Sequence, residues 1–266
     1  MPLHVVVCTK LTPDTTAKVT VDERGVVSWG DAKLVVNPWD EYAIEEAIRL
    51  KEAHGGTATV ICMGPEEHKE ALKESVARGC DDAILLWDEH MAGADTLATA
   101  TVLASAVQKM GDVDVVLFGK QAIDGDTGQT AAHVARRLGW PQLTYVCKIR
   151  QIDPAARTIV VERLLEEGRQ VVQARLPAVI SVVKDINEPR YPSFLGIRKA
   201  AKLAIPVWTT ADLGLEGTRV GATGSGVRWP QILPLPPRGG QCEFIEGTPE
   251  EQARILVDKL LAEKVI

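Results

Sequence analysis

Short apolar runs alternate with amphipathic segments through the first half of the chain. Continuous runs rich in β-branched residues predict buried strands at residues 5–9, 57–63, 83–87 and 113–118. Apolar residues at helical spacing predict helices at residues 38–53, 66–78, 95–110 and 131–138. This alternation predicts an α/β fold built on a doubly wound, mostly parallel sheet.

The region after the first strand interrupts this alternation. Residues 11–16 predict a loop, and residues 19–29 predict a hairpin that projects from one end of the sheet. The next helix should begin with Asn37 as its N-cap and Pro38 at its first position. One face of that helix should carry the buried positions, with charged residues elsewhere: Ile44, Ala47, Ile48 and Lys51 on the face, and Glu45, Glu46 and Arg49 away from it.

The second half has a different pattern. Residues 143–149, 158–163 and 170–174 predict consecutive strands with tight links, so we expect antiparallel additions to the sheet, beside a further strand at residues 177–183. Residues 205–240 are rich in proline and glycine but too apolar for simple disorder. We therefore expect an extended C-terminal arm that wraps around a partner, and then a helix at residues 248–263. The expected organisation is an α/β domain at residues 1–204 and an arm plus terminal helix at residues 205–266.

The most informative stretch follows the predicted strand at residues 113–118. Its glycines and polar residues predict a turn whose N–H groups, with the positive end of the next helix dipole, suit an anion such as phosphate. Asp126 should be the N-cap of that helix, with Gln129 closing a capping box. The alternative is an ordinary strand-to-helix turn. The stretch consists of Gly119, Lys120, Gln121, Ala122, Ile123, Asp124, Gly125, Asp126, Thr127, Gly128, Gln129 and Thr130.

Two other segments should lie beside this stretch. Ligands of doubly wound sheets bind beyond the carboxyl ends of the strands, so residues 8–10 and 63–65 should converge with it on one crevice. Trp39, at the mouth of a predicted helix, either packs in the core or lies over a planar ligand.

Composition narrows the classes of function. The 266 residues carry a net charge of −6, which argues against nucleic acid as a partner. We expect no signal peptide and no membrane insertion, since no apolar run approaches the roughly 20 residues needed to span a bilayer. The five cysteines form no C-x-x-C pair, which indicates reduced thiols in a cytoplasmic setting and no metal site. We also expect no catalytic residue, because each histidine stands without a matching base or ligand nearby in sequence.

Residues 185–204 form a distinct piece. An extended polar loop with two prolines places Phe194, Leu195 and Ile197 at its tip, and a basic helical turn follows. Apolar residues flanked by prolines and cations indicate a surface that contacts another protein. The alternative is a loop whose Phe194 and Leu195 fold back onto the core.

Two phrases in the chain are specific: Gly-Lys-Gln-Ala-Ile-Asp at residues 119–124 and Asn-Glu-Pro-Arg-Tyr at residues 187–191. With residues 7–10, 37–47, 140–142 and 176–179, they make the chain resemble the β subunit of electron-transfer flavoproteins along nearly its whole length. The resemblance implies an adenine-nucleotide-binding fold related to the adenine nucleotide α-hydrolases. It also implies an electron carrier rather than an enzyme, in an obligate heterodimer with an α subunit that holds most of the FAD and on which residues 205–266 dock.

The resemblance also implies two sites. In many family members the β subunit holds an AMP, and the matching positions here are Cys8, Asn37, Pro38, Trp39, Asp40, Met63 and residues 119–130. The recognition loop of the family, which anchors partner dehydrogenases, matches Tyr191, Pro192, Ser193, Phe194, Leu195, Gly196, Ile197, Arg198, Lys199 and Ala200. Familiar members use a leucine as the apolar anchor; Phe194 occupies the aligned position here, and Leu195 follows it.

Three functions stay open at this point. The resemblance implies a carrier that accepts electrons from flavin dehydrogenases, such as the acyl-CoA dehydrogenases of fatty acid oxidation, and passes them toward a membrane quinone reductase. Two departures, Thr15 after Asp14 and the loop sequence of residues 124–128, resemble electron-bifurcating members with a second FAD in the β crevice. The third hypothesis is a nucleotide-binding stress or signalling protein of the same fold, against which the long apolar arm already argues.

Overall fold

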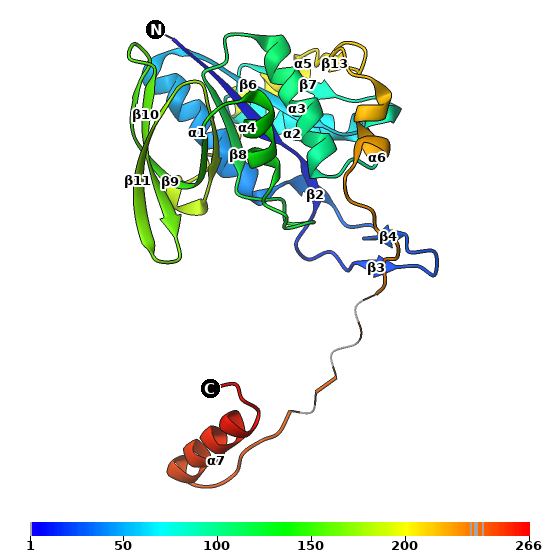
Figure 1. Cartoon of the computed structure of the whole chain (residues 1–266), viewed down its shortest axis with the longest axis vertical. Helices are drawn as coiled ribbons and strands as arrows, with labels where there is room; N and C mark the ends of the chain where they lie inside the picture. The colour runs from blue at the N-terminus through cyan, green and yellow to red at the C-terminus, as the bar shows by residue number, and fades with distance from the viewer. Residues whose placement is uncertain (1, 235, 237–238, 241) are drawn as a thin grey trace.

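The computed structural model describes residues 2–234, 236, 239–240 and 242–266. Within this part of the chain, nine strands form one sheet in the order β11-β10-β9-β12-β8-β1-β6-β7-β13 (Figure 1). Strand β1 (Leu3–Thr9) lies in its interior, parallel to β6 (Gly56–Met63) on one side and to β8 (Val115–Gly119) on the other. Its β-branched residues at 5–7 are fully buried, as a strand covered on both faces requires.

Helices cover both faces of the sheet (Figure 1). The core on one face contains residues of α1 (Pro38–His54), α2 (Lys69–Arg78) and α5 (Phe194–Lys202). The core on the other face contains residues of α3 (Thr96–Met110) and α4 (Thr130–Leu138). The expected doubly wound α/β fold is confirmed.

The chain reverses its direction across the sheet at β1. It first moves outward to β6 and β7 (Asp82–Leu86), and then returns to β8 and β12 (Ala178–Val182) on the opposite side. The carboxyl ends of β1 and β8 therefore lie next to each other at the switch point, where doubly wound sheets bind ligands.

Antiparallel strands extend one edge of the sheet, as expected. Strand β9 (Gln142–Asp153) runs parallel to β12, and β10 (Thr158–Leu165) and β11 (Gly168–Arg175) follow it as an antiparallel meander. At the other edge, β13 (Val207–Trp208) pairs in parallel with β7.

The segment between β1 and α1 differs in part from the expectation. The hairpin of β3 (Thr20–Val21) and β4 (Val27–Ser28) is confirmed. The prediction of a plain loop at residues 11–16 was wrong in its first half, because β2 (Leu11–Pro13) pairs with β5 (Leu34–Val36). Strands of three residues are too short to show alternation, and these two exist only because the chain returns after the hairpin.

Two charged residues of α1 also differ from the expectation. Glu45 and Glu46 are 3% and 8% exposed, although the helical spacing put them away from the buried face. They are buried because the segment after β12 crosses this side of α1 and supplies polar partners, described below.

Short helices and the C-terminal region complete the chain. The predicted helix at residues 66–78 begins as a 3-10 turn before α2, and the arm contains the one-turn helix α6 (Gly221–Gly224). The 3-10 turns span Glu66–His68, Glu89–Met91, Lys184–Ile186 and Gly217–Arg219.

The terminal helix α7 (Pro249–Ala262) is confirmed, with Thr248 and Glu251 forming a capping box. None of its residues is buried, and Figure 1 shows it well apart from the sheet. No helix in the described part of the chain has the length and apolar character needed to cross a membrane.

Candidate functional site

The first residues of α1 join three parts of the crevice. The Asn37 backbone N–H donates to the Lys10 carbonyl at 2.9 Å, just beyond β1. The Asn37 side-chain amide donates to the Gln121 carbonyl at 2.8 Å and accepts from the Ile123 N–H at 3.2 Å. Asn37 therefore occupies the N-cap position, but its side chain makes no capping bond and holds the loop instead.

Asp40 ties the ends of the two central strands together. Its carboxylate accepts from the Lys10 N–H at 3.1 Å and from the Gly119 N–H at 3.3 Å. The side chain is buried, and burial raises the pKa of Asp40 to about 7, although the hydrogen bonds it receives oppose that shift. This carboxylate is a structural junction between β1, β8 and α1.

Gly119 makes this junction possible. A Cβ at this position would lie 2.5 Å from the Asp40 Oδ1 and 2.5 Å from the Trp39 carbonyl carbon. Both distances are shorter than any real Cβ contact, so the end of β8 can approach α1 this closely only as glycine. The glycine expected for a phosphate loop thus has a packing reason in this fold.

The centre of the loop is polar and open. Lys10 Nζ lies 2.7 Å from the Asp124 carboxylate, and the Gln121 amide donates to Asp126 at 2.6 Å. Residues 124–129 are all exposed. The loop is therefore fixed at its start by α1, and its later part faces solvent.

The predicted capping role of Asp126 was wrong. Helix α4 begins at Thr130 with Gln129 at its N-cap position, and no side chain caps it. Asp126 has φ +50°, a left-handed conformation from which the chain does not enter a helix directly. Its backbone N–H closes a turn on the Ala122 carbonyl at 2.9 Å.

Lys120 and two aromatic rings form the next part of the site. The Lys120 ammonium lies 4.9 Å from the centre of the Trp39 ring and 5.9 Å from that of Tyr145. Trp39 is half-buried, so its ring is neither enclosed in the core nor fully exposed to solvent. Tyr145 was not among the expected site residues, because nothing in a strand pattern marks it. Its φ of +57° and the irregular register of β9 become visible only in the structure.

The remaining predicted residues lie around this centre. Pro38 is the first residue of α1, and Met63 ends β6 on the other side of β1 from β8. Cys8 is buried in the core of the α3–α4 face, and burial raises the pKa of its thiol. Lys10 was expected at this crevice as part of residues 8–10, although not as a nucleotide-binding residue, and its ion pair with Asp124 places it beside the loop.

Hollows elsewhere on the described surface do not coincide with this loop. One lies between the hairpin and the arm and is lined by residues 21–25 and 230–234. Another lies near the amino ends of the strands, beside His4, Lys109 and Trp208. We locate the candidate site from the convergence of polar contacts at the switch point. Among the described residues, no group of three or more His, Cys, Asp or Glu side chains is placed to hold a metal ion.

The segment expected to contact a partner was predicted to place its apolar residues at the tip of an extended loop, but the structure places them in a helix. Phe194, Leu195 and Ile197 lie in the first turn of α5, where Ser193 caps the helix by accepting from the Gly196 N–H at 3.0 Å. Phe194 is 74% and Leu195 75% exposed, so the alternative in which both fold back onto the core is wrong. The other predicted contact residues divide: Tyr191 is exposed, whereas Ala200 is buried.

A family model described as "Electron transfer flavoprotein domain" matches residues 25–213. The chain belongs to the electron transfer flavoprotein family. The resemblance inferred from the two sequence phrases is thereby confirmed. Proteins of this family carry electrons, and they are flavoproteins.

Curated relatives align along most or all of the chain. An electron transfer flavoprotein subunit beta of Megasphaera elsdenii is 37% identical over 99% of this chain and 100% of its own. Protein FixA of Azorhizobium caulinodans is 40% identical over 84% of this chain and 81% of its own. The caffeyl-CoA reductase-Etf complex subunit CarD of Acetobacterium woodii is 38% identical over 99% of this chain and 100% of its own.

Proposed function

We propose that this chain is the β subunit of a heterodimeric electron transfer flavoprotein and binds an adenine nucleotide at the switch point of its sheet. The observation that carries the proposal is the attachment of the loop at residues 119–124 to the start of α1 through Asn37 and Asp40. This attachment holds one wall of the crevice in place before a ligand arrives, which lowers the entropic cost of binding.

The residues around the loop fit a phosphate-bearing ligand. The first N–H groups of α4 receive no side-chain cap, and they form the positive end of the helix dipole. Lys120 forms no ion pair within the described residues, so its charge is available to an anion. The buried Thr9 hydroxyl, at the end of β1, has no hydrogen-bond partner among the described residues, and a ligand oxygen would satisfy it.

We propose that the FAD that carries the electrons is held mainly by an α subunit, near the interface between that subunit and this chain. When bound, that flavin would supply the one- and two-electron chemistry, and this chain would hold the nucleotide and one side of the interface. The arm and α7, whose apolar side chains include Leu256, Leu261 and Phe244 exposed at 48%, 55% and 85%, are proposed to dock on the α subunit.

Residues 191–200 are proposed to receive donor flavin dehydrogenases, such as acyl-CoA dehydrogenases, with a membrane quinone reductase as the eventual acceptor. The exposed Tyr191, Phe194 and Leu195 support this role, because three large apolar side chains within five positions are costly to leave in water.

Purification with a co-expressed α subunit tests this function. We expect a yellow heterodimer that contains one FAD and releases one AMP when denatured, both measured by absorbance and mass spectrometry. A stable, colourless monomer that takes up no flavin with the α subunit would contradict the proposal and favour a nucleotide-binding protein without electron transfer.

A second candidate is a bifurcating subunit with FAD in the β crevice. It is favoured by the relative named as a subunit of a caffeyl-CoA reductase-Etf complex, together with Thr15 after Asp14 in this chain. The same measurement separates the two: two flavins per heterodimer and no AMP would support bifurcation, and one flavin with AMP would exclude it.

A further inference from the structure

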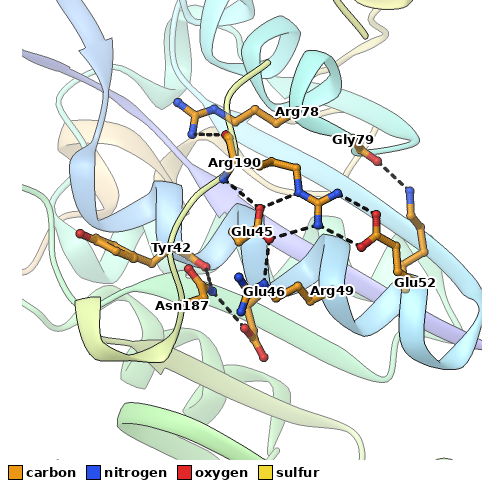
Figure 2. A network of polar contacts seen from close by, with 10 residues as sticks. Tyr42, Glu45, Glu46, Arg49, Glu52, Arg78, Gly79, Asn187 and Arg190 are labelled. Carbon is orange, nitrogen blue, oxygen red and sulfur yellow. Dashed lines mark hydrogen bonds and ion pairs between the residues drawn. The ribbon is translucent and has the colours of Figure 1, made fainter. Parts of the chain in front are cut away.

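A network of ion pairs and hydrogen bonds joins Asn187 and Arg190, in the segment that leads into α5, to α1 and α2 (Figure 2). Its centre is Arg190, which precedes α5 by four residues. The family resemblance implied that residues 191–200 bind a partner, but it implied no role for this network.

Arg190 is bound to two carboxylates of α1, Glu45 and Glu52, which lie about two turns apart on the helix. Its Nε and one terminal nitrogen lie 2.8 and 3.1 Å from the two oxygens of Glu45. Its terminal nitrogens also donate to the two oxygens of Glu52, at 2.7 and 2.9 Å. The Arg190 backbone N–H adds a third bond to Glu45, at 3.1 Å. Such a planar double fork fixes both the position and the orientation of the guanidinium.

Glu45 is the buried end of this clamp, with a side chain that is 4% exposed. Burial by itself would raise the pKa of its carboxyl, but hydrogen bonds from Arg190 and Arg49 outweigh burial and hold the pKa below its ordinary value. Glu45 is therefore ionised at neutral pH, and Arg190 supplies much of the positive charge that offsets the cost of burying its carboxylate.

Further bonds fix the chain on either side of Arg190. The Asn187 amide donates to the Tyr42 carbonyl and to Glu46, both at 3.0 Å, and Arg78 donates to the Arg190 carbonyl at 3.2 Å (Figure 2). On the α2 side, Gly196 packs so tightly that a Cβ would lie 2.0 Å from the Ala77 carbonyl oxygen. The inner surface of residues 187–196 is thus held from both helices.

The outer surface has the opposite character. Tyr191 is 90% and Ile197 52% exposed, and with Phe194 and Leu195 they form an apolar ridge. The α5 sequence beside the ridge contains Arg198, Lys199 and Lys202 and no acidic residue, in a chain of net charge −6. A partner that complements this surface presents an apolar pocket bordered by carboxylates.

We propose that Arg190 is a positioning residue for this ridge. By clamping to Glu45 and Glu52, it orders residues 191–197 before the partner binds, so that the apolar side chains need not be ordered on contact. This inference rests on the proposed function, in which the ridge receives a flavin dehydrogenase.

Hydrogen exchange on the purified heterodimer tests the clamp directly. Arg190→Lys keeps the charge but loses the fork, and should raise amide exchange in residues 191–197 by about tenfold or more. Arg198→Lys is the matched control, because Arg198 lies on the same segment and is exposed; its exchange should equal that of the parent. Equal exchange in all three proteins would overturn the clamp.

Electron transfer from a purified acyl-CoA dehydrogenase tests the consequence for docking. Leu195→Ser removes a ridge side chain and should raise the KM for the dehydrogenase, and Arg190→Lys should raise it by about tenfold with kcat little changed. Added salt should raise the KM of the parent as well, because it screens the cations of α5 from an acidic partner.

The outcomes distinguish the docking function from the positioning role of Arg190. If Leu195→Ser leaves the KM unchanged, the docking function fails and the positioning role fails with it, whatever the exchange data show. If Leu195→Ser raises the KM while Arg190→Lys raises exchange but not the KM, the docking function stands and the positioning role is overturned.

Discussion

The loop at residues 119–124 and the segment at residues 187–190 are both attached to α1, but in different ways. Asn37 and Asp40 hold the loop with hydrogen bonds to its backbone, at the first turn of the helix. Glu45 and Glu52 hold the segment with ion pairs to one arginine, two to four turns further along.

This difference suits the ligand or partner that each region is proposed to bind. Backbone attachment at one end leaves the remaining polar groups of the loop open to a small ligand. Side-chain attachment from beneath leaves an ordered apolar ridge open to a protein. One helix thus supports a polar site at its start and an apolar surface at its middle.

Removing the buried end of the clamp should have the largest effect. Loss of one partner from a buried ion pair costs about 3–5 kcal/mol, and since Arg190 retains Glu52 we expect Glu45→Ala to cost about 3 kcal/mol. Unfolding in urea measures this. The control is Glu70→Ala, which breaks the exposed pair with Lys73 and should cost less than about 0.5 kcal/mol. Similar losses in both variants would show that the clamp does not stabilise the fold.

Adding one carbon at the junction of β8 and α1 should come next. Gly119→Ala forces a Cβ against Asp40 and the Trp39 backbone, and should cost about 2–3 kcal/mol and abolish nucleotide binding. Gly125→Ala, in the same loop, meets only Thr127 at 4.0 Å and should be tolerated. Calorimetric titration with AMP and thermal unfolding compare the two, and equal behaviour would refute the proposed close approach.

The buried carboxylate of the crevice should make stability depend on pH. Because burial raises the pKa of Asp40 to about 7, the folded chain keeps a proton that the unfolded chain releases above about pH 4. Stability should therefore fall as pH rises from about 4 to 7, by up to about 1.4 kcal/mol per pH unit from this group. Asp40→Asn lacks this contribution, so its stability relative to the parent should improve from pH 5 to pH 8. A constant difference would contradict the shift.

The backbone attachment of the loop can be weakened alone. Asn37→Ala removes the bonds to Gln121 and Ile123 and should cost about 1–2 kcal/mol and weaken AMP binding. It should leave hydrogen exchange in residues 191–197 unchanged. Increased exchange there would show that the two regions are coupled through α1 rather than independent.

The smallest effect is expected where the sequence had predicted a helix cap. Asp126 is exposed, has φ +50° and caps nothing, so Asp126→Gly should change stability by less than about 0.5 kcal/mol. Denaturant unfolding checks this, and a loss near 1 kcal/mol would restore the capping role. The effect of this change on nucleotide retention tests the separate proposal that the loop contacts the ligand.

The sequence by itself determined the class of fold and indicated where a ligand is proposed to bind. Runs such as residues 5–7 and 115–118 are strands because β-branched and apolar side chains fill a surface buried on both faces. The alternation of these strands with helices predicts a doubly wound sheet, and the observed strand order places residues 9–10 beside Gly119. Thr248 and Glu251 cap α7 through contacts three residues apart, which are visible in sequence.

Only the tertiary structure decided how the polar residues are used. Asn37 is a residue type that favours helix caps, but its side chain binds a loop residue 84 positions away. Glu45 has the helical spacing of a surface residue, but it pairs with Arg190, 145 positions away. Asp126 has the composition of a cap but lies in a left-handed turn. Apolar burial follows the period of the local element, whereas a hydrogen-bonding side chain takes whichever partner the packed fold brings within about 3 Å.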